Sequence, residues 1–190
     1  MPKTRLEAFS DGVIAIIITV MLLNMEIPQS PTLKALLPVA PVFVCYVLSF
    51  LYLAIYWNNH HHMLQATEHV SAGILWANSH LLFWLSLLPF ATGWMGENRF
   101  APIPTALYGV ILLMCALSYF ILQYRIIDSQ GRKSLLKKAV GSDLKGKLSI
   151  ILYIVGILIS VSSHWSAICV YFLVALMWLV PDKRIERVLH

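Results

Sequence analysis

Six apolar segments dominate this sequence of 190 residues. A helix needs about 20 residues to cross about 30 Å of hydrocarbon, and the first four segments are long enough. The last two are shorter and only four residues apart, which favours a helical hairpin over one continuous helix. None of them alternates between polar and apolar residues as a half-buried strand would. The segments span residues 6–27, 41–60, 71–95, 104–127, 144–161 and 166–180.

The composition excludes an ordinary water-soluble domain. Hydrophobic residues make up 59% of the chain and charged residues 12%, whereas a soluble domain carries about 25% charged residues. We therefore expect an all-α membrane protein of six transmembrane helices, with residues 1–190 forming a single domain. The expected location is the cell membrane, which the chain would cross several times.

The basic residues predict the orientation. With the N-terminus in the cytoplasm, twelve of the fourteen Lys and Arg residues fall inside and only Lys34 and Arg99 lie outside. This agrees with the positive-inside rule and places both termini in the cytoplasm. In an alternative interpretation the basic run 132–147 binds anionic lipid head groups, although topology alone accounts for it.

Proline and cysteine give three local expectations. Pro89 lies inside the third segment and is expected to kink it. Cys45, Cys115 and Cys169 lie inside apolar runs and are expected to be buried thiols. Their scatter does not suit a metal clip.

The start of the first segment carries the unusual chemistry. Thr4 and Glu7 have the spacing of a capping box, which would begin a helix at Thr4. Asp11 then lies nearly two turns inside this helix, where a carboxylate needs a partner. Glu7 has the same charge and Arg5 points about 240° away around the helix, so the partner must come from another helix.

A stripe of four residues follows on the same segment. Ile16, Thr19, Val20 and Leu23 recur at helical spacing. Thr19 alone between Asp11 and Asn24 has a side-chain oxygen. Two interpretations stay open from these residues alone: the stripe lines a polar path, or it faces lipid while Thr19 bonds its own backbone.

The motif Arg5-x-x-x-Phe9-Ser10-Asp11, followed by an Ile-rich helix with Thr19, resembles the signature of the transmembrane protein 175 family. These proteins are potassium channels, and their short prokaryotic members form tetramers of six-helix chains. The resemblance implies a homotetramer with a central pore lined by the first helix. Ile16 would form the narrowest ring, Val20 and Leu23 further apolar rings, and Thr19 hydroxyls that favour potassium over sodium.

The resemblance also implies a structural network that holds the pore helix. Arg5, Phe9, Ser10 and Asp11 would belong to it, joined by His and Trp side chains of the second and third segments. The candidates for these partners in the sequence are Trp57, His61 and His80.

A cluster of histidines is typical of a metal site, but the spacing of these histidines argues against one. Residues 60–62 are all His, and neighbouring helical side chains point about 100° apart. No pair among His60, His61, His62, His69 and His80 has the i, i+4 spacing of a metal-binding helix face. We expect no metal and no cofactor, only permeant K+ ions.

The leading hypothesis is a potassium-preferring cation channel with a hydrophobic constriction, modest selectivity and no enzymatic step. Its partners would be its own copies, the lipid bilayer, and K+ with other monovalent cations, but no nucleic acid. The alternatives are a secondary transporter or a proton-permeable channel. A transporter would be expected to show an inverted repeat with paired broken helices, and the chain has neither. Glu26, just beyond the stripe, could attract cations if several copies surrounded an axis.

Overall fold

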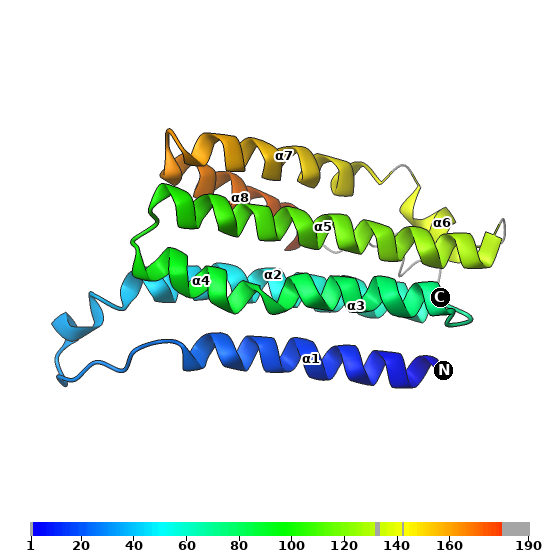
Figure 1. Cartoon of the computed structure of the whole chain (residues 1–190), viewed down its shortest axis with the longest axis horizontal. Coiled ribbons are helices and arrows are strands. Elements are labelled where there is room, and N and C mark those ends of the chain that lie inside the picture. Colours follow the sequence, from blue (N-terminus) through cyan, green and yellow to red (C-terminus); the bar gives the residue numbers. More distant parts are fainter. Residues whose placement is uncertain (1, 132–133, 142, 180–190) are drawn as a thin grey trace.

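The chain folds into a bundle of antiparallel helices (Figure 1). The computed structural model describes residues 2–131, 134–141 and 143–179, and every regular element in these ranges is helical. The expectation of an all-helical fold is therefore confirmed. The elements are α1 (Lys3–Leu23), the short 3-10 helix η1 (Leu33–Leu36), α2 (Ala40–Gln65), α3 (Ala72–Ser86), α4 (Leu88–Glu97), α5 (Pro102–Gln130), α6 (Leu135–Val140), α7 (Leu144–Ser160) and α8 (His164–Leu179).

Four stretches are long and apolar enough to cross a bilayer: α1, α2, α3 joined to α4, and α5. They correspond to the first four apolar segments of the sequence. The helices α7 and α8 have 17 and 16 described residues, or about 25 Å each at about 1.5 Å per residue. A three-residue turn at 161–163 joins them, as the predicted hairpin requires. The full count of six spans stays a prediction.

The third span is broken near its middle. Helix α3 ends at Ser86, Leu87 connects it to the next helix, and α4 begins at Leu88 with Pro89 in its first turn. Proline is tolerated in a first turn, where its missing N–H has no intrahelical partner to lose. The two helices continue in roughly the same direction (Figure 1), so the predicted kink at Pro89 is a break in a single span.

Close packing joins the second half of the bundle. Tyr171 of α8 is fully buried between Gly109 of α5 and Gly156 of α7. A Cβ atom at Gly109 would run into the Tyr171 hydroxyl oxygen, and one at Gly156 would run into its ring. Small residues allow membrane helices to approach in this way.

Two local predictions are wrong. Helix α1 begins at Lys3 after Pro2, without a side-chain cap, so Thr4 lies inside the first turn and does not cap it. Cys169 is exposed on α8, whereas Cys45 and Cys115 are buried as expected. Apolar neighbours in the sequence do not imply burial in a membrane helix, because an outward-facing side chain can contact lipid.

Candidate functional site

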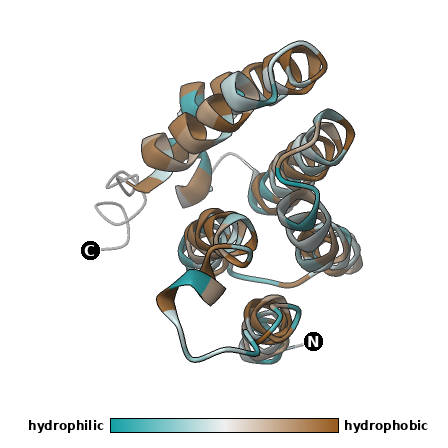
Figure 2. Ribbon diagram, turned by 90° about the vertical axis from the view of Figure 1, so that its left-hand side faces the viewer, coloured by the Kyte–Doolittle hydropathy of each residue, from teal (hydrophilic) through white to brown (hydrophobic). Residues whose placement is uncertain are grey.

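Helix α1 lies at one edge of the bundle and packs on one side only (Figure 2). Its buried residues recur every three or four positions and contact α2, α3 and α4. This period keeps them on one face of the helix. They are Leu6, Ser10, Ile14, Ile17 and Met21.

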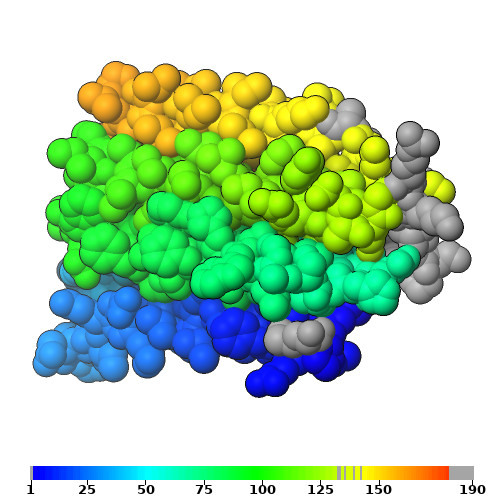
Figure 3. Space-filling model, turned by 45° about the vertical axis from the view of Figure 1, so that its right-hand side comes forward, coloured from blue at the N-terminus to red at the C-terminus, as the bar shows by residue number. Residues whose placement is uncertain are grey.

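The opposite face of α1 is uncovered by the rest of the chain (Figure 3). Ile16 is 63% exposed, Leu23 80% and Val20 38%, and Thr19 is exposed as well. At about 100° per residue, Leu23 lies within about 20° of Ile16 around the helix. Val20 lies about 40° to one side of Ile16 and Thr19 about 60° to the other. Ile16 and Leu23 therefore form the centre of an exposed stripe, and Thr19 and Val20 flank it.

The Thr19 hydroxyl bonds the helix backbone. Its Oγ1 donates to the Ile16 carbonyl oxygen over 2.9 Å. This is the backbone bond that the lipid-facing interpretation expected. However, the bond uses only the hydroxyl proton, so both lone pairs of Oγ1 stay available to a cation. The exposed hydroxyl can therefore act as a fixed acceptor on the stripe.

A chain of hydrogen bonds crosses three helices at the first half of α1. His60 of α2 donates from Nε2 to Asn78 Oδ1 of α3 over 2.7 Å. Asn78 donates from Nδ2 to Ser10 Oγ over 2.9 Å, and Ser10 donates to the Leu6 carbonyl oxygen. Ser10, His60 and Asn78 are at most 1% exposed. The chain is satisfied at each step, so it fixes the rotation of α1 against α2 and α3.

Sequence reasoning missed His60 and Asn78. It identified Ser10 from the motif, but it chose His61 from the triplet 60–62. A usable signal was present: Asn78 lies in the middle of an apolar segment, where a buried amide needs partners on other helices. The identity of the partner depends on the rotation of α2, which the sequence does not give.

Asp11 has the inter-helix partner that its position requires. Trp57 of α2 donates from Nε1 to Asp11 Oδ1 over 3.0 Å. The His61 ring stacks on Trp57 with a centroid distance of 6.4 Å, and His61 Nε2 accepts from Gln65 Nε2. Between the same two helices, Lys3 of α1 donates a hydrogen bond to the Gln65 carbonyl oxygen of α2. The structure thus brings Asp11, Trp57 and His61 together.

Three of the predicted network residues do not join Asp11, Trp57 and His61. Arg5 and Phe9 are exposed, on the uncovered side of α1. His80 accepts a hydrogen bond of 3.1 Å from Trp84 of its own helix. Within the described part of the chain, Arg5 makes no ion pair with Asp11, whose Oδ1 instead accepts from Trp57. Part of the surface of Arg5 and of Phe9 is therefore left uncovered by the described part of the chain.

His60 and His61 have different hydrogen-bond partners, although the rings of His61 and His62 lie 5.6 Å apart. His60 turns toward Asn78 and His61 toward Gln65, as expected for adjacent helical positions. Among residues 2–131, 134–141 and 143–179, no group of three His, Cys, Asp or Glu side chains is arranged to hold a metal ion. The hydrogen bonds of Ser10, His60 and Asn78 orient the helices of this region.

Comparisons with known proteins find relatives that are potassium channels. Residues 5–89 match a family model described as the endosomal/lysosomal potassium channel TMEM175. A potassium channel of Chryseobacterium sp. (strain P1-3) is 52% identical over 187 residues, which cover 98% of this chain and 97% of the relative. A potassium channel of Streptomyces collinus is 31% identical over 60% of each chain.

A solved structure matches as well. The crystal structure of a lysosomal potassium-selective channel TMEM175 homologue from Chamaesiphon minutus superposes with a TM-score of 0.81 at 25% identity. The match covers 95% of this chain and 98% of that one. These proteins are channels and not enzymes, and they are membrane proteins. The chain belongs to the TMEM175 family of potassium channels.

Proposed function

We propose that four copies of this chain form a potassium-preferring cation channel in the cell membrane, with α1 lining a central pore. The exposed stripe of α1 carries the proposal. A single helix cannot enclose a pore, so the stripe requires further copies around an axis. Each copy would contribute one domain of six spans with both termini in the cytoplasm, and the channel would need no cofactor beyond the permeant K+.

The stripe suits a hydrophobic gate. Ile16 and Leu23 are seven residues apart, about 10 Å along the helix. Rings of branched aliphatic side chains at these two levels would exclude water when narrow and conduct when they widen. Ile16 is our candidate for the narrowest ring, with Val20 and Leu23 as further apolar rings.

The proposed selectivity depends on Thr19. Its hydroxyl proton is held by the Ile16 carbonyl oxygen, which directs the lone pairs away from the helix backbone. A ring of such oxygens replaces only a few hydration waters of an ion. We therefore infer a modest preference for K+ over other monovalent cations.

The hydrogen-bonded region at the first half of α1 would keep the stripe facing the pore. The Ser10–Asn78–His60 chain and the Asp11–Trp57 bond both tie α1 to its own bundle. Arg5 and Phe9 are exposed beside the stripe, where they can contact a neighbouring copy. His80 would support α3 through Trp84 and would not join this region directly.

The proposal is tested with purified protein in planar bilayers under opposed K+ and Na+ gradients. We expect an ohmic current whose reversal potential lies on the potassium side. A saturable flux of K+ that is coupled to a second ion would indicate a transporter and not a channel. A reversal potential that follows the proton gradient would indicate a proton-permeable channel.

A further inference from the structure

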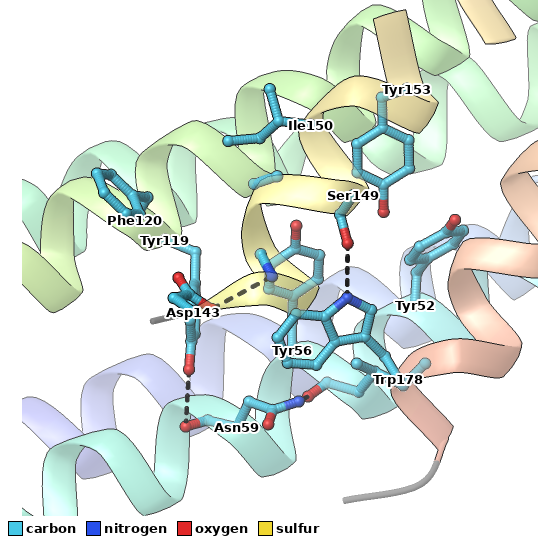
Figure 4. Close-up of a pocket in the computed structure, with 13 residues that line it drawn as sticks. Tyr52, Tyr56, Asn59, Tyr119, Phe120, Asp143, Ser149, Ile150, Tyr153 and Trp178 are labelled. Carbon is cyan, nitrogen blue, oxygen red and sulfur yellow. Dashed lines mark hydrogen bonds between the residues drawn. The ribbon is translucent and has the colours of Figure 1, made fainter. Parts of the chain in front are cut away.

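A cavity opens between α2, α5, α7 and α8, on the far side of α2 from the stripe of α1. Its volume is about 50 Å³, and it is open on one side. Figure 4 shows aromatic side chains around it from all four helices. They are Tyr52, Tyr56, Tyr119, Phe120, Tyr153 and Trp178.

Several polar groups in the cavity wall already have partners. Tyr119 donates to the Asn59 carbonyl oxygen, and Trp178 donates to Ser149 Oγ over 2.8 Å. Asp143 accepts from the Gly146 N–H, in the first turn of α7. The wall therefore presents mostly ring faces and aliphatic carbon to whatever occupies the cavity, which favours an apolar occupant.

The cavity reaches a surface that lipid can contact. Phe120 lines it and is 40% exposed on α5, and Ile150 of α7 is half-buried beside it. In a bilayer such a slot is open to an acyl chain. Asn59, Asp143 and Gly146 place one end of the slot near the end of α2 and the start of α7.

The charge at this end of the bundle is positive. Lys145 Nζ lies 5.8 Å from the centre of the Trp178 ring, so its ammonium group is at the cavity rim. Lys147 is exposed one half-turn further along α7, and α6 adds exposed Lys137 and Lys138. Among the described residues from 134 to 147, four are Lys and one is Asp. Clusters of this kind at a membrane surface attract anionic head groups.

We propose that this cavity binds one anionic phospholipid, with part of an acyl chain between the four helices and the phosphate beside Lys145 and Lys147. The positive rim selects an anionic over a zwitterionic lipid, and the aromatic slot selects a lipid over free phosphate. The site is separate from the α1 stripe, so it does not depend on the proposed ion pathway.

Delipidated protein titrated with phosphatidylglycerol or with phosphatidylcholine of the same chains, read by native mass spectrometry, tests the site. We expect one phosphatidylglycerol per chain to bind more tightly than phosphatidylcholine. Lys145→Gln should lower the affinity for phosphatidylglycerol about fivefold, and the double variant with Lys147→Gln should lower it about 30-fold. The reason is that each basic residue near an anionic surface contributes a factor of about five to the affinity. Lys34→Gln, an exposed lysine beyond the other end of the bundle, is the matched control and should change nothing.

A second measurement tests the acyl chain directly. Phosphatidylglycerol with brominated chains, present as a minor component in phosphatidylcholine vesicles, should quench Trp178. Trp178→Phe keeps an aromatic wall and should remove that saturable part of the quenching. Equal binding of both lipids, full competition by inorganic phosphate, an equal loss in Lys34→Gln, or unchanged quenching in Trp178→Phe would each overturn the proposal.

Discussion

Ile16→Ala should raise the resting conductance of the channel. Ile16 is 63% exposed in the isolated chain, so most of its side chain packs against nothing in its own bundle. A fully buried Ile→Ala change costs about 2–5 kcal/mol, so the fold should lose only on the order of 1 kcal/mol here. The substitution is therefore a test of the pore and not of folding.

The magnitude follows from the ring geometry. Four copies lose three carbon atoms each, and at about 0.8 kcal/mol per methylene the apolar penalty for wetting falls by up to roughly 10 kcal/mol. About 1.4 kcal/mol is enough to change an equilibrium tenfold. We therefore expect at least a tenfold rise in resting current, even if only a small part of this free-energy change favours the wetted, conducting state.

The assay compares K+ current per reconstituted protein with that of a matched variant. Ile151→Ala removes the same three carbons from a side chain of α7 that is 57% exposed. It should leave the current at the level of the unmodified protein. If Ile16→Ala and Ile151→Ala give the same current and the same leak, Ile16 does not line a constriction.

Four further changes test other parts of the account. Thr19→Val keeps the shape of the side chain but removes its lone pairs, and it should lower the K+/Na+ permeability ratio by about two- to tenfold; an unchanged reversal potential removes Thr19 from selectivity. Glu26→Gln should reduce the K+ conductance at low ionic strength and leave it unchanged at high ionic strength, where salt screens the charge. An equal reduction of conductance at both ionic strengths would mean that Glu26 does not attract cations to the pore entrance. Asn78→Leu breaks a satisfied buried chain and should cost roughly 2–4 kcal/mol of stability, seen as a lower Tm in detergent. Gly109→Ala meets the Tyr171 hydroxyl oxygen and should cost about 1–3 kcal/mol; an unchanged Tm would show that α5 and α8 can move apart freely.

The sequence was most informative where one physical rule dominates. Apolar length alone predicts α1, α2 and α5, because a bilayer demands about 20 apolar residues. Pro89 predicts the break between α3 and α4 for an equally local reason. The positions of helix ends are weaker, as Thr4 shows: the capping-box spacing is present, yet the helix begins at Lys3.

Side-chain partners could be predicted in kind but not always in identity. A carboxylate inside a membrane helix needs a partner, and Asp11 has one in Trp57. Whether His60 or His61 faces α1 depends on the rotation of α2 about its axis, and α2 is apolar on nearly all sides. The packing of several helices sets that rotation, so a single segment cannot report it.

The most direct test of the central claim is a thiol at position 16. Ile16→Cys in a Cys169→Ser background leaves only the buried Cys45 and Cys115 as other thiols. Four thiols around an aqueous axis should bind Cd²⁺ tightly, because thiolates prefer soft metal ions, and micromolar Cd²⁺ should block the K+ current reversibly. Leu22→Cys, about 120° around the helix from Ile16, should remain unblocked. Conduction that persists under Cd²⁺ in Ile16→Cys would contradict a pore lined by α1 with Ile16 at its axis.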